Sequence, residues 1–419
     1  MFAKEKTFID QKFKEKVLKD HLSIFCFLML FGLIISFISA ILTVGRSFNG
    51  IFLKDWADVF MDHFNSVMYS DDDPYSKWDV MYPPLITLFY AFIAYITVPF
   101  TVDFGLHSLA MNMRSSNEPM MVFILLMTVA IYFVHFIFTE KLNETMGARR
   151  TEGLFLLTLV SFPMVYCISR GNCLILCLIF ILLFLEGYKS ENRIIRLFSF
   201  VCLGIAAGIK IVPAIFAILI LRERKYRDFV TCFIIVCILL IVPFIFTDGS
   251  LMGMLDTITD TANGRAGREG IFNFSDLVEI IGISSSVGSV LKITVMLLAF
   301  IVILFDREMK EWEAVMLIGA LLCTTFSIGT PYLSLYLIPG IVYFFGNEKK
   351  TKVTVAVAIL LAIAFSMFPS LEEFQIVLFS VKGMSVIVLC VFLIAIGFMR
   401  ISKNRRRLKS EFALQELSS

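Results

Sequence analysis

The class of this protein is decided by one uncharged stretch, LSIFCFLMLFGLIISFISAILTV, at residues 22–44. A helix of about 20 apolar residues is long enough to cross a bilayer. The stretch is longer than the apolar core of a signal peptide, about 7–15 residues, and no A-x-A-like cleavage site follows it. We therefore expect a membrane-spanning helix here.

The composition of the whole chain agrees with this. Of 419 residues, 58% are hydrophobic and 17% charged, whereas a soluble domain is about 45–50% apolar and about 25% charged. Soluble enzymes, nucleic-acid-binding proteins and secreted disulfide-rich proteins are thereby excluded. The net charge of +2 is too small to indicate a polyanionic partner. All 9 cysteines lie in or beside apolar runs, and CxxC is absent, so we expect buried thiols.

Both ends of the chain carry basic residues of the kind that face the cytoplasm in membrane proteins. Lysines between positions 4 and 19 precede the first apolar run, and lysines and arginines follow the last one at Arg400–Lys409. We therefore expect both termini in the cytoplasm, an even number of crossings and a location in the plasma membrane.

The apolar runs predict an all-α polytopic membrane protein of 10–12 spans. The second half reads as spans near 229–246, 289–305, 313–329, 333–346, 352–368 and 376–399. The first half adds runs near 84–100, 119–138, 153–168, 173–187 and 197–221. Twelve crossings place several basic residues outside, against the positive-inside rule, whereas re-entrant segments at 84–100 and 197–221 give ten and remove the conflict. The sequence leaves both counts open.

These boundaries predict four regions along the chain. Residues 1–21 form a cytosolic basic N-terminus, and residues 22–346 form a catalytic transmembrane module. Its two large outer loops are 45–83 and 248–288. Residues 347–399 add C-terminal transmembrane helices, and 400–419 form a cytosolic basic tail.

The first outer loop holds candidate catalytic carboxylates. Aromatic residues recur at helical spacing over 54–68, which predicts a short helix on the membrane surface. Asp58 and Asp62 then share one face of that helix. A carboxylate that is partly desolvated at the edge of the lipid suits a general base, although solvated loop charges are the alternative. Tyr82-Pro83-Pro84 ends the loop and predicts a helix start.

Several motifs follow this loop in order. They are Pro74-Tyr75, Tyr82-Pro83-Pro84-Leu85, Ser161-Phe162-Pro163, Ser169-Arg170-Gly171-Asn172, the run from Gly204 to Lys210 and Pro213, and the run from Thr330-Pro331-Tyr332 to Pro339. The ordered set, over roughly 55–340, resembles the C-fold (GT-C) glycosyltransferases, and more narrowly it is similar to glycosyltransferase family 87. Two features depart from the family pattern: neither Asp58 nor Asp62 precedes an aromatic residue, and the late motif lacks a histidine.

The resemblance implies a GT-C-like bundle with short re-entrant or juxtamembrane helices. It implies an inverting transfer of one sugar, mannose or another hexose or pentose, from a polyprenyl phosphate, with no nucleotide sugar and no cofactor. The acceptor would be a lipid or polymer on the extracytoplasmic face, in the synthesis of a cell-envelope glycan or glycolipid. The sequence leaves open the sugar, the acceptor and the oligomeric state.

Three sets of site residues are predicted. The general base is Asp62, with Asp58 as the close alternative. Donor phosphate binding is assigned to four cations: Lys210, Arg170, Arg265 and Arg268. The substrate-pocket residues are His63, Asn65, Tyr75, Tyr82, Asn172 and Tyr332. No metal is expected, because His63 has no further ligands at a recognisable spacing.

Each assignment has an alternative that the sequence leaves open. An intramembrane lysine such as Lys210 usually marks function, but it can also snorkel to an interface. Arg170 can be a plain anchor at the end of a span. The chain could also be a lipid-linked glycan flippase or other transporter, or a polysaccharide polymerase centred on 248–288.

Overall fold

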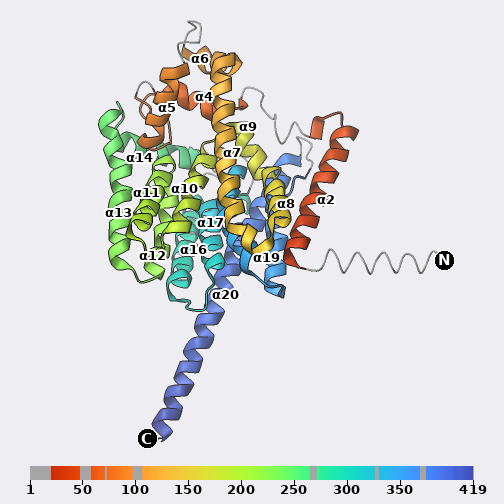
Figure 1. The fold of residues 1–419 in the computed structure, drawn as a ribbon, viewed down its shortest axis with the longest axis vertical. Helices are drawn as coiled ribbons and strands as arrows, with labels where there is room; N and C mark the ends of the chain where they lie inside the picture. The colour runs from red at the N-terminus through yellow and green to blue at the C-terminus, as the bar shows by residue number, and fades with distance from the viewer. Residues whose placement is uncertain are drawn as a thin grey trace, which may run out of the picture.

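The computed structural model describes residues 20–47, 58–70, 73–97, 106–264, 271–325, 330–368 and 374–418. All regular structure in these ranges is helical (Figure 1). Five helices are long and apolar enough to cross a membrane: α2 (His21–Leu42), α7 (Asn117–Met146), α13 with η4 (Tyr226–Ile241 and Val242–Phe246), α16 (Ser285–Phe305) and α20 (Gln375–Ser418). The protein is therefore an all-α polytopic membrane protein, as the composition predicts.

Shorter helices complete the bundle. A sixth candidate span consists of α8 (Ala148–Leu159) and α9 (Phe162–Arg170), which are bent by 52° against each other. Shorter apolar helices are α5 (Pro84–Thr97), α10 (Leu174–Gly187), η3 with α12 (Val212–Ala217 and Ile218–Arg222), η5 with α18 (Pro331–Leu337 and Ile338–Asn347) and α19 (Lys352–Phe365). The remaining helices are α4 (Met61–Tyr69), α6 (Leu106–Ser115), α11 (Arg193–Ile209), α14 (Leu251–Gly264), α15 (Phe274–Ile280) and α17 (Glu311–Thr324).

Ion pairs between helix ends mark one end of the bundle, which we call the lower end because α20 leaves the bundle downwards there in Figure 1. Lys141 pairs with Glu186, and Lys189 pairs with both Glu223 and Glu311, at 3.0–3.1 Å. The ends of α7, α10, α12 and the start of α17 therefore lie together. The opposite, upper end carries α4 and α6 (Figure 1).

The pairing of Lys189 with Glu223 has a consequence for topology. The segment between these residues must leave the lower end and return to it. It does so as a hairpin of α11, η3 and α12, with Lys210 in extended backbone at the tip. Likewise, the helix that follows α5 in the described chain, α6, packs on α4 at the upper end. Both features match the ten-span alternative with re-entrant segments, although the number of crossings stays a prediction.

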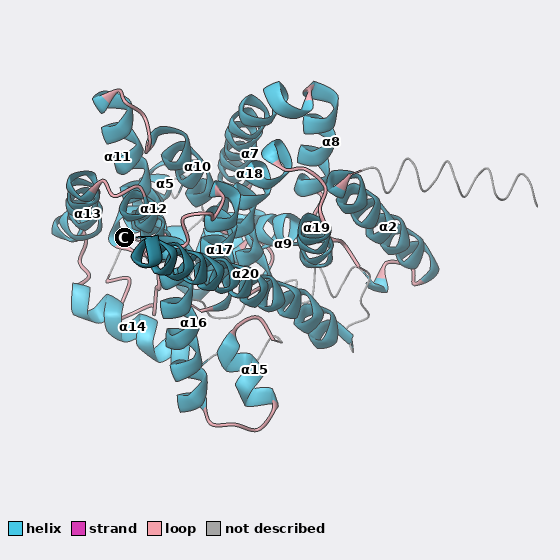
Figure 2. Cartoon of the chain, turned by 90° about the horizontal axis from the view of Figure 1, so that it is seen from below, coloured by secondary structure: helices cyan, strands magenta, loops and turns pink. Residues whose placement is uncertain are grey.

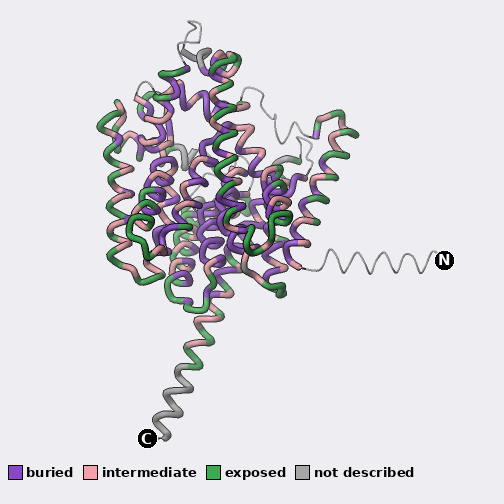
Figure 3. The backbone as a smooth tube through the Cα atoms, in the orientation of Figure 1, coloured by how far each residue is buried: buried purple, intermediate pink, exposed green. Residues whose placement is uncertain are grey.

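The buried residues lie where the helices meet. The central helix α17 is buried along its length, whereas α2 and α13 at opposite edges of the bundle expose many apolar side chains (Figures 2 and 3). Exposed apolar side chains on outer helices are expected where lipid replaces water as the solvent. One large core joins residues from α2 to α20, so the predicted catalytic module and the C-terminal helices pack together.

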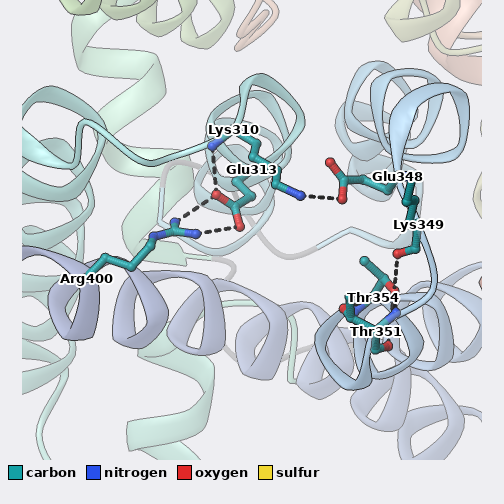
Figure 4. A network of polar contacts seen from close by, with 7 residues as sticks. All are labelled: Lys310, Glu313, Glu348, Lys349, Thr351, Thr354 and Arg400. Carbon is teal, nitrogen blue, oxygen red and sulfur yellow. Dashed lines mark hydrogen bonds and ion pairs between the residues drawn. The ribbon is translucent and has the colours of Figure 1, made fainter. Parts of the chain in front are cut away.

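A polar network holds the lower end together (Figure 4). Arg400 on α20 donates two hydrogen bonds to Glu313 at 2.7 and 2.9 Å and one to Asp306 at 2.7 Å. Lys310 pairs with Glu348 in the loop before α19. The start of α17 and the loop before it are thereby attached to α20 and to the loop between α18 and α19.

Candidate active site

The chain reaches the site just before α4, through a break in helical geometry. Phe60 has a left-handed backbone, with φ of 63°, and its N–H donates to Ser169 O at 2.8 Å. The helix α4 therefore begins only at Met61. The prediction of one continuous helix over 54–68 is wrong for Asp58, which lies in the turn before α4, while residues 54–57 lie outside the described residues.

Gly171 lets the end of α9 approach this loop closely. Its φ is 68°, a left-handed conformation that L side chains rarely adopt. A Cβ at this position would lie 3.0 Å from Phe60 O and 3.1 Å from His63 Cβ. The glycine thus satisfies both the helix cap and the contact, and the residues on either side of it, Arg170 and Asn172, face the aspartates.

The two aspartates and Arg170 form one ion cluster. The guanidinium donates through Nη1 to Asp58 Oδ2 and through Nη2 to Asp62 Oδ1, the latter at 2.7 Å. Asp62 Oδ2 also accepts from Asn172 Nδ2 at 2.8 Å. The exposed fraction of the side chains falls from 53% at Asp58 to 16% at Asp62, and Asn172 is fully buried. The cluster is therefore open to solvent at Asp58.

Tyr82 connects this cluster to Lys210. Asn172 Nδ2 donates to Tyr82 Oη at 3.1 Å. The Lys210 ammonium lies 5.2 Å from the centre of the Tyr82 ring and 5.3 Å from that of the Tyr332 ring, which is within cation–π range. Gly208 allows the end of α11, next to Lys210, to pack closely on the start of α5, next to Tyr82. A Cβ at Gly208 would lie 2.4 Å from a methyl group of Leu85.

Lys210 is a cation without an ion pair in the part of the chain that the structure describes. Its charge is close enough to interact with that of Asp62. Lys210, Tyr82 and Tyr332 are all partly exposed. A lysine in such apolar surroundings usually has a partner and often marks a functional site.

The structure thus brings together most of the predicted site residues: Asp58, Asp62, Arg170, Asn172, Tyr82, Lys210 and Tyr332. Tyr75 is fully buried, and its hydroxyl donates to Tyr82 O at 3.1 Å. Tyr75 therefore holds the backbone of Tyr82 in place and does not itself face the cluster. Asn65 lies half-buried on α4 and makes no hydrogen bond to the cluster among the described residues. Arg265 and Arg268 lie outside the described residues.

His63 faces away from the cluster. Its ring contacts those of Phe64, Tyr90 and Phe123, with centroids 4.9–5.5 Å apart. Burial lowers the pKa of His63 to about 4, so the ring is neutral at physiological pH. The described residues contain no group of three side chains suited to a metal, and a metal-free reaction stays a prediction.

Sequence reasoning missed two features of the site. Arg114 on α6 donates to Val59 O at 3.2 Å and so holds the turn that carries Asp58. Tyr166 on α9 stacks on Tyr332, with centroids 6.2 Å apart. Neither contact has a local sequence signal, because each joins residues far apart in the chain. The left-handed Gly171 did have one, since a glycine directly after a helix commonly caps it.

A known family matches more than half of the chain. The profile of glycosyltransferase family 87 matches residues 81–328. The chain belongs to glycosyltransferase family 87. The matched family 87 region includes Tyr82, Arg170, Asn172 and Lys210, while Asp58, Asp62 and Tyr332 lie outside it. Neither a curated protein nor a solved structure matches the chain. As a member of family 87, the protein is a membrane glycosyltransferase.

Proposed function

We propose that the protein transfers one sugar from a polyprenyl phosphate to an acceptor hydroxyl on the extracytoplasmic face of the plasma membrane. The observation that carries the proposal is the meeting of two outer-loop aspartates, Arg170 and Lys210 at the upper part of the bundle. A carboxylate can take the acceptor proton, and a cation can hold the departing phosphate.

The hydrogen bonds favour Asp58 as the general base. Both carboxylate oxygens of Asp62 are occupied, one by Arg170 and one by Asn172. Asp58 uses only Oδ2 among the described contacts, and its side chain is 53% exposed. Asp58 Oδ1 is thus able to accept a hydrogen bond from the hydroxyl group of the sugar acceptor. Sequence context alone favours Asp62, which in this arrangement orients Arg170 instead.

Lys210 is the best-placed ligand for the donor phosphate. Arg170, the other described candidate, is engaged by two carboxylates. Lys210 has aromatic rings around it and, among the residues that the structure describes, no carboxylate in contact. In the reaction, the acceptor oxygen attacks the anomeric carbon and its proton passes to Asp58. The bond from that carbon to the phosphate oxygen breaks, and the electron pair remains on the phosphate.

The positions of charged residues support the orientation. The basic segment that follows Arg400 lies on the part of α20 beyond the lower end (Figure 1), and basic segments favour the cytoplasm. The cluster of aspartates lies towards the opposite end. A transporter remains the second candidate because of Lys210, but membership of a glycosyltransferase family does not support it.

Substitution of the two aspartates tests the proposal. Purified protein would be incubated with radiolabelled polyprenyl-phosphate mannose, glucose or arabinose and membrane extract. We expect labelled product from the wild type. In Asp58→Asn the rate of sugar transfer should fall about 10²–10⁴-fold, as for the loss of a general base, and in Asp62→Asn it should fall less. Asp256→Asn removes an exposed carboxylate of α14 and is the matched control. Unchanged product from both site variants would refute the proposal.

A further inference from the structure

Tyr82 stands between the carboxylate cluster and Lys210. Its Oη lies 3.1 Å from Asn172 Nδ2, and its ring lies beneath the Lys210 ammonium at 5.2 Å. Its backbone carbonyl is held by the Tyr75 hydroxyl at 3.1 Å. The ring and the backbone of Tyr82 are therefore both held in place, next to the group that we assign to the donor phosphate.

The surrounding hydrogen bonds determine where the Tyr82 hydroxyl proton can point. Asn172 donates to Tyr82 Oη, so the phenol is an acceptor on that side. Asn172 Oδ1 accepts Leu174 N–H at 3.1 Å and makes no contact with the phenol among the described residues. The Asp62 oxygens accept from Arg170 and Asn172. A hydroxyl has one proton to donate, and no residue in the described ranges receives that of Tyr82.

We propose that Tyr82 donates a hydrogen bond to a phosphate oxygen of the lipid-linked donor, and that Asn172 is a positioning residue that orients this hydroxyl. The inference rests on the proposed function. An anion attracted to Lys210 lies beside the Tyr82 ring, within reach of its hydroxyl. Negative charge grows on the phosphate as its bond to the sugar breaks, so a donor fixed there stabilises the transition state. Tyr82 keeps its proton throughout.

Binding of the lipid phosphate tests the inference independently of transfer. The probes are undecaprenyl phosphate and, as its uncharged match, undecaprenol. We expect Tyr82→Phe to weaken binding of the phosphate by about 10–100-fold, which corresponds to the loss of a hydrogen bond to a charged group. Binding of the alcohol should stay unchanged. Tyr343→Phe removes a buried hydroxyl that donates to Leu185 O at 3.1 Å. Tyr343 lies beside Lys141 at the lower end of the bundle, opposite the cluster, so this change should alter neither affinity.

Kinetics provide the second measurement. In Tyr82→Phe we expect kcat to fall about 10²-fold, as for the loss of one oxyanion-hole donor, while the KM for the donor changes less. A merely structural role would instead lower the melting temperature and the amount of folded protein. Wild-type affinity for undecaprenyl phosphate in Tyr82→Phe would overturn the inference.

The role of Asn172 is read from a double-mutant cycle. In Asn172→Ala, the Tyr82 hydroxyl is free to donate to Asp62 Oδ2, so affinity for undecaprenyl phosphate should fall. In the Tyr82→Phe background, Asn172→Ala should lower the affinity for undecaprenyl phosphate much less, because no hydroxyl remains to be misdirected. Full additivity of the two losses would contradict the positioning role.

The failure of this inference differs from the failure of the proposed function. If the wild type binds undecaprenyl phosphate but transfers no sugar from any polyprenyl phosphate, the proposed function is wrong. If the wild type transfers sugar and Tyr82→Phe matches it in affinity and in kcat, the inference about Tyr82 alone is wrong.

Discussion

Asp62 and His63 are neighbours in the sequence, yet their side chains lie in opposite environments. Asp62 faces Arg170 and Asn172, whereas His63 packs among aromatic rings. The helix α4 separates the two, since consecutive residues of a helix point about 100° apart. The aromatic side of α4 anchors it in the core, and the acidic side is thereby held towards the cluster.

His63 predicts a pH dependence of stability. Its pKa is about 4 in the folded chain and about 6.5 in an unfolded chain. As the pH falls below about 6.5, the unfolded chain binds a proton that the folded chain does not, so the folded state loses stability. By pH 5 this amounts to about 2 kcal/mol. His63→Phe keeps a buried ring, so its melting temperature should fall less than that of the wild type between pH 7 and pH 5, with activity retained. An equal fall in both proteins would contradict this.

The sequence marks the candidate site residues better than it predicts the contacts between them. Charged residues in apolar surroundings and the motif order mark Asp58, Arg170 and Lys210. Their pairing could not be predicted, because Arg170 and Asp58 are 112 positions apart. Only the fold shows that Arg170 binds the two carboxylates and leaves Lys210 facing the aromatic rings.

At the scale of elements, the turn after α9 and the turn before α4 depend on each other. Both Phe60 and Gly171 have left-handed backbones, and the Phe60 N–H donates to Ser169 O. Either turn alone would leave polar backbone groups without partners. The two turns together align Asp58 and Asp62 with Arg170.

This dependence predicts the effect of Gly171→Ala. A left-handed alanine costs about 1–2 kcal/mol, and its Cβ would lie 3.0 Å from Phe60 O. We expect a lower melting temperature and a loss of transfer activity, since α4 must move away from α9. Gly153→Ala on α8 is the matched control, because a Cβ there meets nothing within 4 Å. Equal behaviour of the two variants would show that the close approach is unimportant.

Some elements were predictable from local rules and others were not. Two prolines at the end of the outer loop predict the start of α5, which begins at Pro84. The helix over 54–68 was expected from aromatic periodicity, but the contact of Phe60 with Ser169 overrides it. That contact is tertiary, and periodicity carries no information about it.

At the scale of the whole molecule, the network around Arg400 fastens α20 to the loops at the lower end. The side chains of Asp306 and Glu313 are only 0% and 4% exposed. Two buried carboxylates without a cation are strongly unfavourable. Arg400 is therefore needed for the folding of the bundle rather than for its chemistry.

Arg400→Met should destabilise the protein by about 3–5 kcal/mol, the cost of leaving buried charges unpaired. The matched control, Arg150→Met, removes a half-exposed arginine whose ion pair with Asp20 spans 3.5 Å. It should lower the free energy of unfolding by about 0–1 kcal/mol. Melting temperatures of the two purified variants, compared with the wild type, measure the difference. Equal stability of the two would mean that the network is unimportant.

The hairpin of α11, η3 and α12 starts and finishes on the same side of the bundle. Its presence therefore does not change the side on which any later segment emerges. A through-going helix in its place would reverse the direction of every helix after it. A change confined to the tip that carries Lys210 would therefore leave the direction of every later helix unchanged.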